Sequence, residues 1–216
     1  MKKRILWLLI GLSFYFPAFV IGTSVVLLGL AVALAQPLLL LASVANLYLL
    51  PLLTYRVFHL FYPVFEGKAQ MWPLDDDNPS SWIVSHKLQL VFEAMPFLEH
   101  VLVLVPGLYA FWLRLWGSKV GGDTFFTPQV EVTDRGLVDI GDHAFFGHRV
   151  FMSSHIVTKK GDAYVLYVRR IRIGEGCFVG AMSSFGPGTD IAPGTFVPLS
   201  SYTLMDDTEP RSMIRP

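Results

Sequence analysis

Apolar residues recur at two different spacings along this chain, and the change of spacing divides it. From Ile5 to about Tyr62 the apolar run is almost unbroken, with Arg56 and His59 as its only charged or imidazole side chains. From about Val120 onward, an apolar residue returns at every sixth position. The first pattern is typical of membrane-spanning helices, and the second of short strands separated by regular turns.

The six-residue spacing predicts a parallel β-helix. Each apolar residue would point into a prism, and each coil would cover the coil below, so that the core runs through all coils. A small residue usually follows the apolar one, where we expect a Cβ to clash or φ to be positive. The apolar positions are Ile140, Phe146, Met152, Ile173, Val179, Phe185, Ile191 and Val197. The small residues are Gly141, Gly147, Ser153, Gly174, Gly180, Gly186 and Ala192.

Two irregularities interrupt this spacing. Val132 and Ile140 are eight residues apart, which indicates a two-residue insertion around 133–136. A loop over about 158–170 then separates His155 from the next coil. The basic residues of this loop, which surround an apolar centre, are Lys159, Lys160, Arg169 and Arg170. We expect the loop either to bind a phosphate-bearing donor or lipid headgroup, or to clasp a neighbouring subunit.

The segment from about 117 to 205 resembles the left-handed β-helix acyltransferases of the hexapeptide-repeat family. In the acetyltransferase branch of that family a His precedes a loop that leaves the prism, and the coil then restarts. This chain has His155, the loop, and IGEGCFVG starting at Ile173. The join at 113–121 is similar to that of membrane-attached members, including the C-terminal region of some membrane-bound peptide synthetases. The resemblance implies an all-β left-handed parallel β-helix and acyl transfer from a thioester.

The resemblance also implies roles for several residues. His155 would be the general base that takes a proton from an acceptor hydroxyl or amine, a task that suits imidazole near neutral pH. Gly180 and Ala181 match the family's donor-binding pair of a Gly and a small residue. The candidates for supporting the base are His148, His143 and Asp142. The carboxylate that orients His155 stays open among Asp134, Asp139 and Asp142.

Three neighbouring histidines also raise the question of a metal site. The γ-type carbonic anhydrases, which share the fold, use a His-x4-His pair and one His about two coils earlier. His143 and His148 have the x4 spacing, but residues 107–112, two coils earlier, contain no His. Zinc would need three protein ligands. We therefore expect no metal.

Residues 1–65 are expected to form a transmembrane helical hairpin. The apolar run is long enough for two spans of about 20 residues, with a turn near Gln36–Pro37 or, as a second option, at 22–24. A secretory signal peptide is the alternative, but the stretch is too long and no small-residue cleavage site follows it. Basic residues at both ends of the hairpin place the following domain on the cytoplasmic face of a bacterial-type inner membrane.

Residues 66–116 are expected to hold a polar break and then interfacial, amphipathic helices. The break ends in Ser80 or Ser81, which would cap the next helix. The residues expected at headgroup depth are Trp82, Trp112 and Trp116. A third membrane span over 97–116 is the alternative. The last segment, 206–216, would be a C-terminal tail that is either frayed or packed on a neighbour.

Composition narrows the class of protein. The chain is 53% hydrophobic and has a mean hydropathy of +0.50, which is too apolar for an ordinary soluble domain of this size. The net charge is zero, so electrostatics provide no case for a nucleic-acid partner. The single cysteine, Cys177, excludes an internal disulfide and is expected to pack in a coil.

The expected function is that of a membrane-anchored, homotrimeric acyltransferase. It would move an acyl group, acetyl in the first instance, from a CoA or carrier-protein thioester to a hydroxyl or amine of a membrane-associated acceptor. The carrier would be an acyl or peptidyl carrier protein, and no cofactor would be permanently bound. The competing hypothesis is a non-catalytic trimeric β-helix scaffold in a membrane complex, which would have no need of a His beside a basic loop.

Overall fold

The computed structural model describes residues 2–72 and 79–212. The chain forms two compact units, one from Met1–Phe65 with Asp76–Met95 and the other from Glu66–Asp75 with Pro96–Pro216. The predicted segment 66–116 is therefore divided between the two units. Its middle helix packs with the N-terminal helices, whereas its first strand and its last helices belong with the β-helix.

The first unit is helical. Its helices are α1 (Lys2–Ser13), α2 (Phe16–Ala33), α3 (Pro37–Phe61) and α4 (Ser81–Ala94). α2 and α3 form a hairpin whose turn contains Ala35 with φ of 50°. Inside this apolar pair, the Asn46 amide donates to Val20 O at 3.1 Å and to Ser24 Oγ at 2.7 Å. Such interhelical bonds hold apolar helices together where the hydrophobic effect does not distinguish helix from lipid.

Both α2 and α3 are long and apolar enough to cross a membrane, judged by length and composition. The alternative of a third span over 97–116 is not met. This stretch is divided into α5 (Phe97–Val103) and α6 (Leu108–Trp116), each far shorter than the roughly 20 residues that a span requires. Gly107 begins α6 with φ of 77°, so the Pro106–Gly107 pair breaks the helix.

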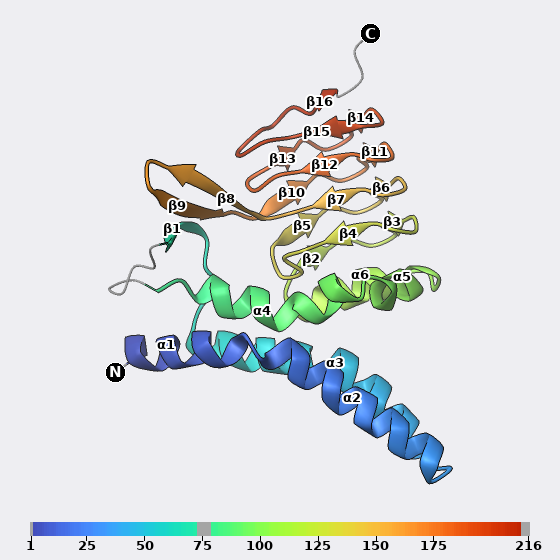
Figure 1. The fold of residues 1–216 in the computed structure, drawn as a ribbon. Helices are drawn as coiled ribbons and strands as arrows, with labels where there is room; N and C mark the ends of the chain where they lie inside the picture. Colours follow the sequence, from blue (N-terminus) through green and yellow to red (C-terminus); the bar gives the residue numbers. More distant parts are fainter. Residues whose placement is uncertain (1, 73–78, 213–216) are drawn as a thin grey trace. The chain divides into compact units, whose positions relative to one another are not determined.

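The second unit is built around a three-sided prism, and each side of the prism is a sheet of parallel strands (Figure 1). Face B contains β2 (Lys119–Val120), β5 (Val138–Ile140), β10 (Ile171–Ile173) and β13 (Asp190–Ile191). Face C contains β3 (Phe125–Phe126), β6 (Phe145–Phe146), β11 (Phe178–Val179) and β14 (Phe196–Val197). Face D contains β4 (Glu131–Val132), β7 (Phe151–Met152), β12 (Ser184–Phe185) and β15 (Ser201–Tyr202), with an antiparallel strand β16 (Arg211–Ser212) at its end.

The prism is the predicted left-handed β-helix. The apolar positions of successive coils pair in parallel register, as Ile140 does with Ile173 and Phe146 with Val179. These side chains are at most 4% exposed, so one continuous core runs through the coils. Beyond the coils, β16 pairs with β15, so part of the tail predicted to fray is held in a sheet.

The small residues after the apolar positions serve close packing between coils. A Cβ on Gly141 would lie 2.4 Å from Glu175 N, and one on Gly180 would lie 2.4 Å from Leu199 N. The left-handed backbone of these turns falls instead on other residues, such as His143 and Arg149, with φ of 55° and 58°. Of the two expected reasons for glycine, the clash with the next coil is therefore the one that applies at these positions.

The predicted loop over 158–170 is a β-hairpin. It consists of β8 (His155–Lys160) and β9 (Ala163–Val168), and β9 also pairs with β1 (Gly67–Trp72) to form a three-stranded antiparallel sheet. Figure 1 shows the hairpin projecting to one side of the prism. The segment predicted to leave the prism over about 158–170 does so, but as a hairpin, and the polar break predicted before Ser81 contains the strand β1. The sequence does not show this strand because it pairs with a segment about a hundred residues away.

Candidate active site

One corner of the prism differs from the other two. The chain passes from face D to face B through residues 133–137 and, one coil later, through 153–170. Both the two-residue insertion and the hairpin therefore leave the prism at this same corner, in successive coils. We call it the insertion corner.

His155 and Asp134 meet at the insertion corner. His155 Nδ1 lies 2.7 Å from Asp134 Oδ2. The Asp134 side chain is only 2% exposed, and that of His155 is 19% exposed. A carboxylate that is removed from water in this way needs hydrogen-bond donors to offset its lost hydration. The imidazole N–H supplies one of them.

This contact fixes the chemistry of the imidazole ring. With the proton on Nδ1 and directed at Asp134, the basic lone pair is on Nε2. Asp134 also stabilises the imidazolium that forms when Nε2 takes a proton, as the carboxylate does in a catalytic triad. The pair therefore has the geometry that an oriented general base requires.

Local contacts hold Asp134 in place. Thr133 N still donates to Met152 O at 3.1 Å, so the strand ladder continues to the residue before Asp134. The chain then turns, with Leu137 N donating to Asp134 O at 2.9 Å. Thr133 Oγ1 lies 3.2 Å from both Asp134 Oδ2 and Ser153 Oγ. Two extra residues thus allow a turn that directs the carboxylate to the coil above.

The neighbouring residue, Arg135, anchors the insertion. Its guanidinium donates to both carboxylate oxygens of Glu99 in α5, at 2.7 and 2.6 Å. Glu99 also accepts from Trp112 Nε1 of α6 at 2.7 Å. Arg135 and Glu99 are 2% and 5% exposed. This bidentate pair ties the helices of the second unit to the turn that carries Asp134.

The buried position of Trp112 corrects an expectation for these helices. Trp112 and Trp116 are 5% and 1% exposed within the structure, rather than placed outward at headgroup depth. Arg114 lies on the same helix and donates to Val120 O at 2.7 Å and to Gly121 O at 2.8 Å. The helix therefore serves as a base for the first coil.

The other predicted supporting residues lie at other corners. His143 is in the turn from face B to face C and is exposed. His148 is in the turn from face C to face D and is also exposed. Asp142 Oδ1 accepts from Gly122 N at 2.6 Å, which joins two coils. Residues close in sequence are separated here because each six-residue step leads to a new corner.

The donor-binding candidates Gly180 and Ala181 follow β11, at the turn from face C to face D. Gly180 N donates to Val197 O at 2.8 Å, and Ser200 N donates to Ala181 O at 2.8 Å. Within one chain, this turn and the insertion corner lie at opposite edges of face D. A single subunit does not bring Gly180 beside His155.

Two of the four basic residues of the hairpin region are held by carboxylates. Arg169 Nη1 lies 2.8 Å from Asp206 Oδ1, and Arg170 Nη1 lies 3.0 Å from Asp139 Oδ1. The hydrogen bond to Tyr167 and the charge of Asp206 raise the pKa of the Arg169 guanidinium. Lys159 and Lys160 remain exposed on β8. The two arginines join the hairpin region to the prism, whereas no such ion pair is seen for the exposed Lys159 and Lys160 in the described part of the chain.

The sequence contained a signal that would have selected Asp134. Val132 and Met152 occupy the same place in successive coils, 20 residues apart because of the insertion. Counting back 20 residues from His155 reaches 135, next to Asp134. Asp139 and Asp142 fall instead on or beyond the following strand. Glu99 could not be found this way, because it lies outside the repeats.

Solved structures that align with this chain are hexapeptide-repeat acetyltransferases, the family that the sequence resembles. One such enzyme from Vibrio cholerae is 16% identical, with a TM-score of 0.35, over 56% of this chain and 89% of that one. The structure of this enzyme in complex with acetyl coenzyme A aligns over 46% of this chain and 62% of that one, at 16% identity and a TM-score of 0.32. A maltose O-acetyltransferase from Clostridium difficile is 11% identical, with a TM-score of 0.26, over 57% and 86%.

No family model and no curated protein matches the chain. The β-helix is therefore assigned from the strand register of this chain itself.

Proposed function

We propose that this protein is a membrane-anchored acyltransferase in which His155 is the general base and Asp134 orients it. The observation that carries the proposal is the 2.7 Å contact between His155 Nδ1 and the buried Asp134 carboxylate. A β-helix that served only as a scaffold would gain nothing from a buried carboxylate aimed at a partly exposed imidazole, because burying that charge is costly.

The reaction would be an acyl transfer from a thioester. The acceptor hydroxyl or amine attacks the thioester carbonyl carbon while its proton moves to His155 Nε2. The carbon–sulfur bond of the resulting tetrahedral intermediate then breaks. The departing thiolate takes the proton back from the imidazolium, which restores the base. Asp134 stabilises the positive ring between these two steps.

The proposed active form is a homotrimer. His155 and the Gly180–Ala181 pair lie at opposite edges of face D in one chain, so a neighbouring copy is needed to place them in one groove. The donor would be acyl-CoA or an acyl or peptidyl carrier protein. His148 lies at the same corner as Gly180 and would flank that groove from the neighbouring copy.

The acceptor is proposed to be membrane-associated. The support comes from α2 and α3, whose length and composition suit a bilayer. Basic residues at both ends of this hairpin favour a cytoplasmic position for the second unit, where thioester donors are found. The site is then on the membrane side on which newly made lipids and lipid-linked acceptors are available.

The test is donor hydrolysis and transfer by detergent-purified protein, comparing wild type with His155→Ala. Acetyl coenzyme A, which the Vibrio cholerae enzyme binds, is the first donor, followed by longer acyl donors with a membrane-lipid extract. Loss of a general base lowers the rate by roughly 10²–10⁴-fold. Equal rates in wild type and His155→Ala would contradict the role of His155. If the wild-type protein neither binds nor consumes any donor, the acyltransferase proposal is wrong and the scaffold hypothesis replaces it.

A further inference from the structure

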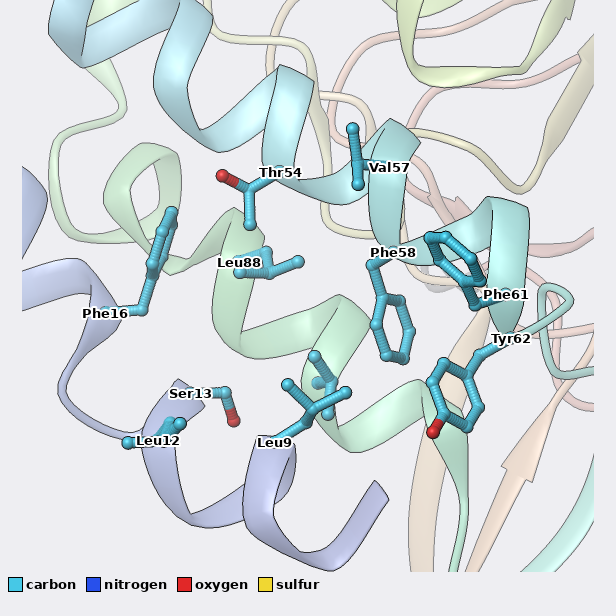
Figure 2. A pocket seen from close by; sticks show the side chains of 11 residues that line it. Leu9, Leu12, Ser13, Phe16, Thr54, Val57, Phe58, Phe61, Tyr62 and Leu88 are labelled. Carbon is cyan, nitrogen blue, oxygen red and sulfur yellow. The ribbon is translucent and has the colours of Figure 1, made fainter. Parts of the chain in front are cut away.

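The helical unit contains an apolar cavity of about 300 Å³ between α1, α3 and α4 (Figure 2). Its walls include Leu9 and Leu12 of α1, Val57 and Phe61 of α3, and Leu88 of α4. Figure 2 shows Phe16 and Leu12 on one side of the cavity and Phe61 and Tyr62 on the other. The volume lies at the lower end of the range for ligand pockets, which suits one alkyl chain rather than two.

Two of the three hydroxyl groups at the walls of this cavity, those of Ser13 and Tyr62, are used in bonds to the protein. Ser13 Oγ donates to Ile10 O at 2.7 Å in its own helix. The Tyr62 hydroxyl donates to Lys2 O at 3.2 Å. Water is a poor occupant of such a site because it needs two to four polar partners. A hydrocarbon chain needs none.

Positive charge lies at one end of this cavity. The bond from Tyr62 to Lys2 brings the first residues of α1 to the Tyr62 side. The exposed basic residues there are Lys2, Lys3 and Arg4. In the described part of the helical unit, Glu93 is the single acidic residue. The charge around the cavity is therefore positive and complements an anion.

We infer that this cavity binds the alkyl chain of a single-chain anionic amphiphile, with the headgroup at Lys2–Arg4. The inference stands on the cavity walls and the basic residues, and it does not depend on His155. For a chain that enters the cavity from water, each methylene buried raises the affinity about fourfold, until the cavity is filled. A longer chain then gains nothing more.

The experiment uses the full-length protein in neutral phosphatidylcholine nanodiscs. A photoreactive alkyl phosphate is crosslinked at several chain lengths, and the labelled residues are identified by mass spectrometry. We expect labelling of the walls on α1, α3 and α4, increasing with chain length and then reaching a plateau. Labelling confined to the outer faces of α2 and α3, or labelling by a diacyl phospholipid probe to the same extent, would overturn the inference.

A matched pair of variants separates the cavity from the general apolar surface. Val57→Trp puts an indole into the cavity, whereas Leu53→Trp puts one on the same helix at a site that does not line it. These two residues are similarly exposed, 54% and 57%. We expect Val57→Trp to lower cavity labelling at least about tenfold, as loss of roughly two methylenes of burial would, and Leu53→Trp to leave it unchanged. Equal labelling in both would contradict the inference.

A second pair on α1 covers the case in which Val57→Trp does not fold. Leu12 lines the cavity and Leu8 does not, and they are 59% and 62% exposed. Leu12→Trp is expected to lower labelling and Leu8→Trp to leave it intact.

The headgroup is tested with Lys2, Lys3 and Arg4 all changed to Gln. This should weaken the alkyl phosphate and not the matching alkyl alcohol. Equal loss for both probes would contradict an anionic headgroup.

The proposed acyltransferase function is tested independently of this site. His155→Ala should bind the alkyl phosphate as wild type does, even where transfer is lost. Intact probe binding together with an inactive wild type would argue against the acyltransferase alone. Active transfer without probe binding in the cavity would argue against the alkyl-chain site alone.

Discussion

The corners of the prism are made by the same six-residue step, yet one of them is built differently. At the two regular corners, glycines let one coil lie directly on the next, and exposed residues such as His143 take the left-handed turns. At the insertion corner the chain has extra residues. There it buries two charged side chains, Asp134 and Arg135, each 2% exposed.

This difference shows where a repetitive fold can carry chemistry. A regular corner has no room for an extra side chain, because a Cβ added to Gly141 would lie only 2.4 Å from the coil above. Where the chain has extra residues, its backbone moves away from the neighbouring coil and leaves room for larger side chains. The extra residues allow one side chain to reach the coil above and another to reach α5. The departures from the repeat are therefore the places to look for a site, and the predictions below test that contrast.

The largest effect is expected from Glu99→Ala. It leaves the buried Arg135 guanidinium without its carboxylate, and loss of one partner of a buried pair costs about 3–5 kcal/mol. We expect a large drop in thermal stability, measured by far-UV circular dichroism in detergent. Replacing both partners, as Glu99→Leu with Arg135→Met, should recover most of it. A single variant as stable as wild type would show that the insertion corner does not depend on this pair.

The next effect is on the rate of transfer and is expected from Asp134→Asn. The amide keeps the shape of the carboxylate but neither stabilises the imidazolium nor favours the same tautomer, so we expect kcat to fall roughly 10²–10⁴-fold. Thermal stability should change much less than in Glu99→Ala. The prediction is checked by measuring kcat for the wild type and for Asp134→Asn with acetyl coenzyme A as the donor. A wild-type rate in the Asn variant would mean that orientation by Asp134 is not used.

Gly141→Ala tests the regular corners. Its Cβ would press against Glu175 N, and overpacking of this kind costs about 1–3 kcal/mol. Ala192 provides the matched control, since it follows the same face in the last coil and no further coil covers it. Ala192→Gly should change stability by no more than roughly 1 kcal/mol. The stabilities of the two variants are compared by thermal unfolding. An equal loss of stability in both would contradict the close-packing argument.

The smallest effect is expected from His143→Asn. Asn tolerates the left-handed backbone at this exposed position, so stability should stay within about 0.5 kcal/mol of wild type. Transfer activity should be unchanged, because His143 lies at a corner away from both His155 and Gly180. The same transfer and unfolding assays apply. A loss of rate without a loss of stability would return His143 to the candidate site.

Much of the fold could be predicted from local spacing. The apolar residue at every sixth position predicted the coils, and the eight-residue step from Val132 to Ile140 placed the insertion correctly. Ser80 also caps α4 as expected, accepting from Trp82 N at 3.3 Å. These features follow from neighbouring residues, whose order alone decides strand, turn and cap.

The candidate site could be predicted only in part. His155 was predicted from its place before the interruption, and within one chain His143 and His148 lie at other corners of the prism. Residues that are close in sequence can lie at different corners of the prism, because each six-residue step takes the chain to another face. The partner, Asp134, lies 21 residues away and becomes a neighbour only because one complete coil returns the chain to the same corner.

The amino-acid sequence by itself determined the repeating core, the apolar hairpin and the positions at which the repeat is interrupted. The tertiary structure decided which carboxylate meets His155, that Glu99 holds Arg135 across 36 residues, and that Glu66 meets the backbone of Arg170 across 104. The physical reason is the range of the interactions. Backbone turns and side-chain spacing act within a few residues, whereas a buried charge is stabilised by whichever partner the folded chain brings to it.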